Sequence, residues 1–181
     1  TPYNISKYYS KKLESFIYKY FESNKVDVVH IDHLHMSWVI DVIRKISDVP
    51  VILREHNLEL KIMKRYFDEQ TNIMLKYYAG IQLKKFTSYE PNRCEKFDSC
   101  LMVTEEDEKS ILNYNPRIKT KVIPIGVDKK IFDMRKSDII PYSIFHIGSL
   151  EWQPNYDGLL WFIKNVYPTI VEKFPMTKLY V

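Results

Sequence analysis

The chain has 181 residues, of which 45% are hydrophobic and 28% are charged, and its formal net charge is +4 at pH 7. This composition is typical of a globular protein and excludes a disordered one, and the length allows one domain, or one domain with a piece of another. No apolar run approaches the ~20 residues that span a bilayer, which excludes a membrane-spanning helix.

Two spacings of apolar residues alternate along the first two thirds of the chain. Helical spacing between residues 5 and 21 predicts one amphipathic helix of about five turns, closed by Asn24 in the left-handed conformation. Short β-branched runs predict buried strands, with helices between them. In chain order we expect a strand at 26–31, a helix at 36–46, a strand at 51–53, helical pieces from 58 to 96, a strand at 100–103, a helix capped by Thr104, and a strand at 122–124. The long helical region should break near residues 70–72 and kink or end at Pro91.

The pattern lapses at residues 129–141, which predicts an interdomain linker, and then resumes. A strand at 143–147, a helical stretch at 154–174 and the start of a strand at 179–181 form one further βα unit. Strands that alternate with helices predict an α/β fold, with a Rossmann-like parallel sheet, helices on both faces and right-handed crossovers. We expect two domains: residues 1–128 form part of a first Rossmann-like domain, and residues 142–181 form the truncated start of a second one. A lone βα unit cannot bury both faces of its strand, so we expect the protein to continue past residue 181.

Ligands of open α/β sheets bind beyond the carboxyl ends of the strands. The first predicted strand ends in a histidine-rich segment that contains His30, Asp32, His33 and His35. Three imidazoles and a carboxylate can ligate zinc, but the spacing matches no metal motif, and alternation along an extended segment separates neighbouring side chains. We therefore expect no metal, and the segment either binds acceptor hydroxyls or is a polar loop that lines a cleft.

Two other strand ends carry candidate residues. His56 directly follows a buried strand, where an imidazole can donate hydrogen bonds to phosphate or sugar oxygens or be satisfied by nearby backbone. Gly148 and Ser149 follow the strand at 143–147, and small residues there allow a diphosphate to approach backbone amides. The same pair also suits an ordinary tight turn, since no GxGxxG or P-loop pattern is present.

Cysteine content and charge bear on location and partners. Cys94 and Cys100 lack a CxxC spacing, which disfavours a disulfide framework and fits a reducing cytoplasm. The modest charge and the lack of a known motif disfavour nucleic acid. Six basic residues near interleaved tyrosines form either solvated helix faces or a peripheral contact with the inner face of the membrane: Lys7, Lys11, Lys12, Lys61, Lys64 and Arg65.

Four stretches, in this order and spacing, resemble the retaining glycosyltransferases of family 4, which have the GT-B fold. They are VILREHN at 51–57, DSCLMVTEED at 98–107, VIPIGVD at 122–128 with Phe132, and FHIGSLEWQPNYDGL at 145–159. The resemblance implies two Rossmann-like domains, the first binding the acceptor and the second a nucleotide sugar. It implies transfer of a sugar to a glycan or lipid-linked acceptor with retention of configuration, in cell-surface polysaccharide or glycoconjugate synthesis. No cofactor or metal is implied, since the nucleotide sugar is a co-substrate.

The same resemblance assigns roles to individual residues. His56 would contact the donor sugar or diphosphate at the reaction centre, and Gly148 and Ser149 would lie by the diphosphate. The acceptor would face Asn57 and the segment from Asp32 to His35, which includes His33.

The sequence also departs from the family. The glycine-rich acceptor loop, the donor-domain Arg/Lys pair and the two glutamates seven residues apart are missing, and Ile125 stands where Asn is frequent. We therefore expect this chain alone to be inactive. Two interpretations from other classes remain open: a non-catalytic α/β module that binds a nucleotide or sugar, and a metal-dependent hydrolase that uses His30, His33 and His35.

Overall fold

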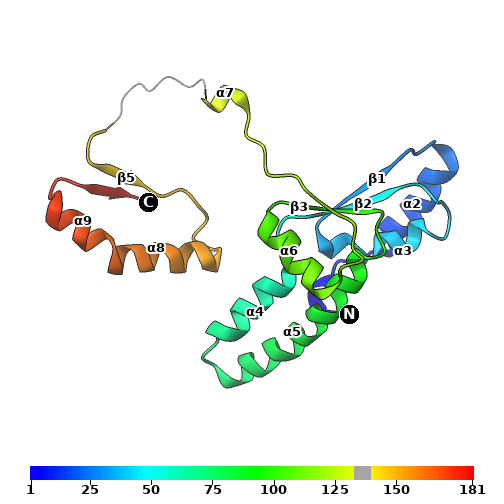
Figure 1. Ribbon diagram of the computed structural model, residues 1–181, viewed down its shortest axis with the longest axis horizontal. Coiled ribbons are helices and arrows are strands. Elements are labelled where there is room, and N and C mark those ends of the chain that lie inside the picture. Colours follow the sequence, from blue (N-terminus) through cyan, green and yellow to red (C-terminus); the bar gives the residue numbers. More distant parts are fainter. Residues whose placement is uncertain (133–139) are drawn as a thin grey trace. The chain divides into compact units, whose positions relative to one another are not determined.

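The computed structural model describes residues 1–132 and 140–181, and the side chains of Ile131 and Phe132 are not described. Contacts divide the chain into two compact units, Thr1–Gly126 and Val127–Val181 (Figure 1). The predicted linker at 129–141 includes the short helix α7 (Lys129–Phe132), and its residues 133–139 lie outside the described part of the chain.

The first unit is built on a four-stranded parallel sheet flanked by helices, as predicted for an α/β fold (Figure 1). Its strands lie side by side in chain order: β1 (Val29–Asp32), β2 (Val51–Glu55), β3 (Ser99–Met102) and β4 (Thr120–Val122). All three pairings are parallel, so the carboxyl ends of these strands meet at one edge of the sheet.

The core of this unit lies on one face of the sheet. Along β2, Val51, Leu53 and Glu55 are buried while the residues between them are half-buried. Cys100 pairs with Leu53 and Met102 pairs with Glu55, so one buried row crosses the sheet. Apolar residues of the helices cover that row, among them Ile40, Ile43 and Phe86. The packing fixes the register, because a slip by one residue would turn the buried row outward.

The amino-terminal helix differs from the prediction. The segment 5–21 forms two helices, α1 (Tyr3–Ser6) and α2 (Lys11–Ser23). Ser10 is extended, and its hydroxyl accepts a hydrogen bond from the Leu13 amide, so it caps a new helix where a single one was expected. Asn24 is also extended, and its side-chain amide donates to the Tyr20 carbonyl, which satisfies the helix end without a left-handed residue.

The remaining helices of this unit agree better with the sequence. They are the 3₁₀ turn η1 (Leu34–Met36), α3 (Val39–Ile43), α4 (Glu59–Glu69), α5 (Ile73–Cys94) and α6 (Glu105–Tyr114). The predicted break at 70–72 is confirmed, and Asn72 caps α5. The Thr104 cap on α6 is confirmed as well. Pro91 lies in the last turn of α5, which ends three residues later, at Cys94.

None of the helices in the described part of the chain is both long and apolar enough to cross a bilayer.

The second unit is a βαβ arrangement. Strands β5 (Ser143–Phe145) and β6 (Lys178–Tyr180) pair in parallel, and α8 (Gln153–Asn165) and α9 (Tyr167–Lys173) connect them. The predicted helix at 154–174 is therefore interrupted at Val166, two residues before Pro168, whose ring and missing N–H do not suit a helix interior. Large apolar residues remain exposed in this unit, among them Phe145 and Trp161.

Candidate functional site

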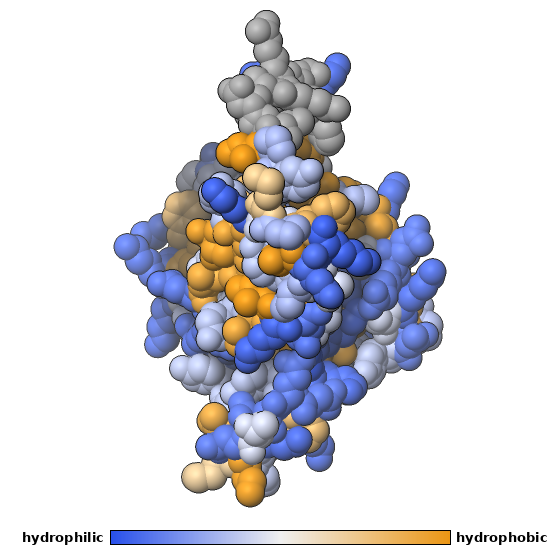
Figure 2. All heavy atoms as spheres, turned by 90° about the vertical axis from the view of Figure 1, so that its left-hand side faces the viewer, coloured by the Kyte–Doolittle hydropathy of each residue, from blue (hydrophilic) through white to orange (hydrophobic). Residues whose placement is uncertain are grey.

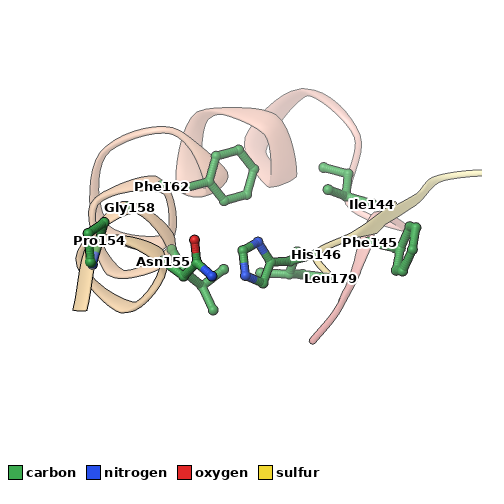
Figure 3. Close-up of a pocket in the computed structure, with 9 residues that line it drawn as sticks. Ile144, Phe145, His146, Pro154, Asn155, Gly158, Phe162 and Leu179 are labelled. Atoms are coloured by element: carbon green, nitrogen blue, oxygen red, sulfur yellow. The ribbon is translucent and has the colours of Figure 1, made fainter. Parts of the chain in front are cut away.

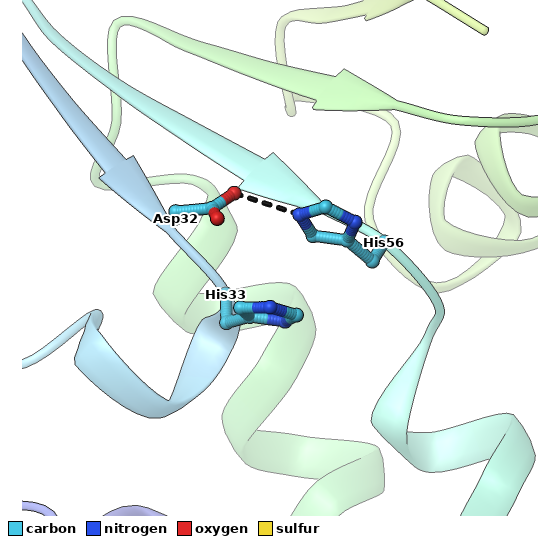
Figure 4. A group of neighbouring side chains, drawn as sticks. All are labelled: Asp32, His33 and His56. Atoms are coloured by element: carbon cyan, nitrogen blue, oxygen red, sulfur yellow. Dashed lines mark hydrogen bonds and ion pairs between the residues drawn. The ribbon is translucent and has the colours of Figure 1, made fainter. Parts of the chain in front are cut away.

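The carboxyl edge of the first sheet brings together two residues that are far apart in the chain. Asp32 is the last residue of β1 and pairs in register with Arg54, so His56 comes two positions beyond that pair. His56 Nε2 lies 2.7 Å from Asp32 Oδ1, and the two groups form a hydrogen bond (Figure 4). The loop after β2 is therefore tied to the end of β1 directly at this edge.

The electrostatics of this contact identify its donor and acceptor. The hydrogen bond from His56 lowers the pKa of Asp32, and nearby histidines add to that effect, while burial opposes it. A carboxylate can only accept, so His56 Nε2 carries the proton. The other ring nitrogen, Nδ1, takes no part in this hydrogen bond. A ring fixed in this way can accept a hydrogen bond from a sugar hydroxyl at Nδ1, and in its doubly protonated form it can donate one to a phosphate oxygen.

His33 adds a second ring to this cluster. Its ring stacks on His56 with a centroid distance of 4.2 Å and an interplanar angle of 22° (Figure 4). Its backbone has φ 70° and ψ 141°, a region that non-glycine residues rarely adopt, and its amide donates to the Arg54 carbonyl. Strained residues of this kind cluster at functional sites, where surrounding contacts hold them.

His35 lies beside the cluster in a drier environment. Its Nε2 is 3.8 Å from a carboxylate oxygen of Glu59, and its ring meets Tyr8 edge-on at 5.2 Å. Burial lowers the pKa of His35, and His33 and Lys7 lower it further. Burial also raises the pKa of Glu59. The two groups therefore form no full ion pair at neutral pH, since desolvation disfavours both charged forms.

The predicted site residues thus divide into two sets. Asp32, His33 and His56 are in direct contact, His35 lies next to His33, and Asn57 is exposed directly after His56. Gly148 and Ser149 belong to the second unit.

Within the second unit, a side chain at Gly148 would require the Asn155 side chain to move. A β-carbon added there would come within 2.8 Å of Asn155 Nδ2, which donates a hydrogen bond to the Ser149 carbonyl. Figure 3 shows the adjacent pocket of about 380 Å³ between β5 and α8, which His146, Asn155 and Phe162 line. Sequence reasoning missed His146 and Asn155, although both lie within three residues of a strand or helix end that it had predicted.

One group in the described residues has the proximity that metal ligation needs. The ligand atoms of Asp32, His33 and His56 lie within 4.8 Å of one another. This group shares only His33 with the histidine trio considered from the sequence. Its present geometry is that of a hydrogen-bonded pair with a stacked ring, because His56 bonds to Asp32 and the two imidazoles lie nearly parallel.

The predicted basic surface is partly neutralised by acidic neighbours. Lys61 pairs with Glu106 and Asp107, and Lys64 pairs with Asp68. The most exposed large apolar residues of the first unit lie at the start of α5, next to the turn that joins it to α4. Figure 2 shows apolar surface at the lower end of the molecule, where Figure 1 places that turn. Ile73 is 85% exposed, Met74 82% and Tyr77 74%.

Comparison with known proteins adds to this geometry. The family model described as Glycosyltransferase Family 4 matches residues 3–130. A Klebsiella pneumoniae protein, described as an uncharacterized 44.6 kDa protein in the cps region, is 25% identical over 130 residues. That match covers 71% of this chain but only 32% of the relative, so the chain spans about a third of its length. No solved structure matches the chain.

Proposed function

The chain belongs to Glycosyltransferase Family 4, and from this membership we propose that it is part of an enzyme that transfers a sugar from a nucleotide-sugar donor to a glycan or lipid-linked acceptor. The observation that carries the proposal is the Asp32–His56 pair at the carboxyl edge of a parallel sheet, the edge where α/β proteins bind their ligands. The relative in a cps region supports a role in polysaccharide or glycoconjugate synthesis. On this proposal the first unit binds the acceptor and the second begins a nucleotide-sugar-binding domain, as in a GT-B fold.

His56 is the proposed contact to the donor at the reaction centre. Asp32 holds its Nε2–H, so the neutral ring offers Nδ1 as an acceptor to a sugar hydroxyl, and the doubly protonated ring donates from Nδ1 to a diphosphate oxygen. Gly148 and Ser149 lie at a strand-to-loop turn, where backbone amides can stabilise the charge that develops on a leaving diphosphate. Such preorganised donors are each worth about 3 kcal/mol of transition-state stabilisation. We propose that the acceptor hydroxyl attacks from the face that the diphosphate leaves, so configuration is retained.

We propose that the acceptor binds to the other polar residues at the carboxyl edge of the first sheet. The free oxygen of Asp32 and the exposed amide of Asn57 can hydrogen-bond sugar hydroxyls, and the rings of His33 and His35 give flat surfaces for the apolar face of a sugar. The identity of the sugar depends on contacts beyond these residues.

The test is an assay of the full gene product with nucleotide-sugar donors and a glycan or lipid-linked acceptor. We expect transfer, with the anomeric configuration of the product, read by NMR, equal to that of the donor. We expect His56→Ala to lower kcat roughly 100-fold while the protein stays folded. Wild-type rates in that variant would remove His56 from the reaction. Donor binding without turnover in the wild type would favour the non-catalytic module instead.

A second candidate rests on the proximity of Asp32, His33 and His56. If these groups rearrange to converge on a cation, the site would suit metal-dependent hydrolysis. Metal analysis of the purified protein decides between the two: one zinc per chain, lost in His33→Ala and His56→Ala, would support the hydrolase.

We also propose a peripheral contact with a membrane, which a lipid-linked acceptor would require. The proposal rests on the exposed apolar residues at the start of α5, next to the turn after α4: Ile73, Met74 and Tyr77. Lys76 lies among them on the same helix. Exposed apolar groups beside basic ones are typical of helices that lie in the headgroup region of anionic bilayers.

A further inference from the structure

The loop that carries His56 is only three residues long and is fixed at both ends. Strand β2 ends at Glu55, and α4 begins at Glu59, so residues 56–58 connect them. Leu58, the last residue of the loop, is buried. A loop this short leaves the His56 backbone few conformations once the residues on both sides of it are held in place. The contacts that hold those residues therefore determine the direction of the His56 ring.

The first anchor acts at the end of β2. The Glu55 side chain is buried and points into the core, where the Cys94 thiol donates to its Oε1 at 3.6 Å. Glu55 also pairs in register with Met102 on β3. The residue directly before His56 is therefore held by a neighbouring strand and by the last turn of α5.

The second anchor acts at the start of α4. The two carboxyl oxygens of Glu90 accept hydrogen bonds from the Glu59 amide at 2.8 Å and from the Leu60 amide at 2.7 Å. These amides have no partner inside their own helix, because the first turn of a helix leaves its N–H groups unsatisfied. Leu58, in the capping position, has no side chain that can accept them. Glu90 supplies the cap from 30 positions along the chain and is itself fully buried.

Glu90 and Cys94 are four residues apart on α5, so they lie on the same face of that helix. One buried face of α5 thus contacts both flanks of the three-residue loop. We propose that Glu90 is a positioning residue for His56: by capping α4 it fixes the loop, and with it the orientation in which the His56 ring meets Asp32 and the substrate. The kinetic test of this inference rests on the proposed transferase function. A second test, on the His56 ring itself, is independent of that function.

The variant is Glu90→Gln, which keeps the size of the side chain but replaces one acceptor oxygen with an NH₂ group facing an amide donor. A matched control is Asn115→Ala. Asn115 is also buried, and its side chain also makes two hydrogen bonds, donating to Glu95 and accepting from the Arg117 amide. It follows α6 and precedes β4, so it lies at the opposite edge of the sheet from His56.

Both variants of the full gene product are compared with the wild type below their unfolding temperatures. We expect Glu90→Gln to lower kcat by about 10-fold or more, with a smaller change in the KM for the acceptor, because a displaced contact at the reaction centre acts on the transition state. We expect Asn115→Ala to keep kcat within about 2-fold at a similar loss of thermal stability. Equal kcat losses in the two variants would show that Glu90 is merely structural.

The second readout follows the His56 ring without any substrate. In protein with ¹³C-labelled histidine, the His56 signal is assigned by its loss in His56→Gln. We expect that signal to shift in Glu90→Gln and to stay in place in Asn115→Ala. An unshifted signal in Glu90→Gln overturns the inference. A shifted signal in a protein that transfers no sugar overturns the proposed function alone.

Discussion

The Asp32 carboxylate and the His56 imidazole meet at 2.7 Å although 24 positions separate them in the chain. Parallel pairing of β1 with β2 brings their two strand ends to one edge, and the hydrogen bond then selects which ring nitrogen carries the proton. This single contact links the fold to the chemistry proposed for it.

Removing the charge of Asp32 should weaken the reaction without unfolding the protein. In Asp32→Asn the side chain keeps an oxygen that can accept from His56, but it no longer holds the ring with a carboxylate. Hydrogen bonds to charged groups contribute about 1.5–3 kcal/mol, so we expect kcat to fall roughly 10-fold to 100-fold. Steady-state kinetics measure this. The control is Asp27→Asn, an exposed residue paired with Lys25 before β1, which should retain the wild-type rate. Unchanged kcat in Asp32→Asn would contradict the assigned role.

The buried carboxyl of Glu90 should make stability depend on pH. Burial raises the pKa of Glu90 from its ordinary 4.5 to about 8, against the lowering effect of the Leu60 and Glu59 amides. Between these values the folded state holds a proton that the unfolded chain has released, so the free energy of unfolding falls as pH rises through this window. Glutamine does not titrate, so Glu90→Gln should lose this part of the slope.

The measurement is urea unfolding of the wild type and Glu90→Gln at pH 5, 6, 7 and 8. Glu55 and Glu59, whose pKa values burial also raises, contribute in the same direction, while the lowered pKa of His35 contributes in the opposite direction below its ordinary value. The contributions of Glu59 and His35 largely cancel in the difference, whereas the negative charge of Glu90 itself helps to raise the pKa of Glu55, so Glu90→Gln also removes part of the Glu55 contribution in the same direction. We expect the destabilisation caused by Glu90→Gln to shrink steadily from pH 5 to pH 8. A difference that stays constant, or grows, would be inconsistent with a raised pKa.

A methyl group at Gly148 should displace a neighbouring side chain, whereas one at Gly158 should not. In Gly148→Ala the new methyl group would displace the Asn155 amide from the Ser149 carbonyl, at a cost of about 1 kcal/mol, and would alter the turn proposed to face the diphosphate. Gly158 lies inside α8 with nothing within 4 Å of an added β-carbon, so Gly158→Ala should stabilise the helix by up to about 1 kcal/mol. Thermal unfolding and calorimetric titration with a nucleotide sugar measure both effects. The idea fails if Gly148→Ala binds the nucleotide sugar as tightly as Gly158→Ala does.

The apolar turn between α4 and α5 should control binding to lipid. We expect the protein to co-sediment with vesicles that contain phosphatidylglycerol and to bind vesicles of phosphatidylcholine alone more weakly, because Lys76 and Arg65 attract anionic headgroups. Ile73→Asp should lower that binding about 10-fold, since it places a charge where apolar surface would be buried. Val28→Asp changes a 51% exposed residue elsewhere and should leave binding intact. Equal vesicle binding by both variants would show that the turn makes no contact with lipid. A dimer in solution that Ile73→Asp disrupts would instead show that this surface binds a second copy of the chain.

By itself the sequence determined the alternation of parallel strands with helices, the break at residues 70–72 and the Thr104 cap, because these follow from local apolar spacing and from side chains that bond to backbone within three residues. The order of the strands in the sheet came from the structure, and β4 ends at Val122, where the predicted strand at 122–124 begins. The sequence also placed Asp32 and His56 in the segments that follow the first and second predicted strands. It did not reveal that Ser10 would divide the first helix, since the apolar spacing runs through the division unchanged and the competing cap is a weak local signal.

The tertiary structure alone decided which of these side chains meet. The Asp32–His56 hydrogen bond, the stacking of His33 on His56 and the Glu90 cap on α4 join residues separated by 23 to 31 positions, a separation over which no local pattern carries information. Such contacts depend on sheet register and helix packing, which are set by burial across the whole core. Glu90 shows the reason most clearly: in the sequence it is one charged residue of a polar helix, and only packing turns it inward, to the amides at the start of α4.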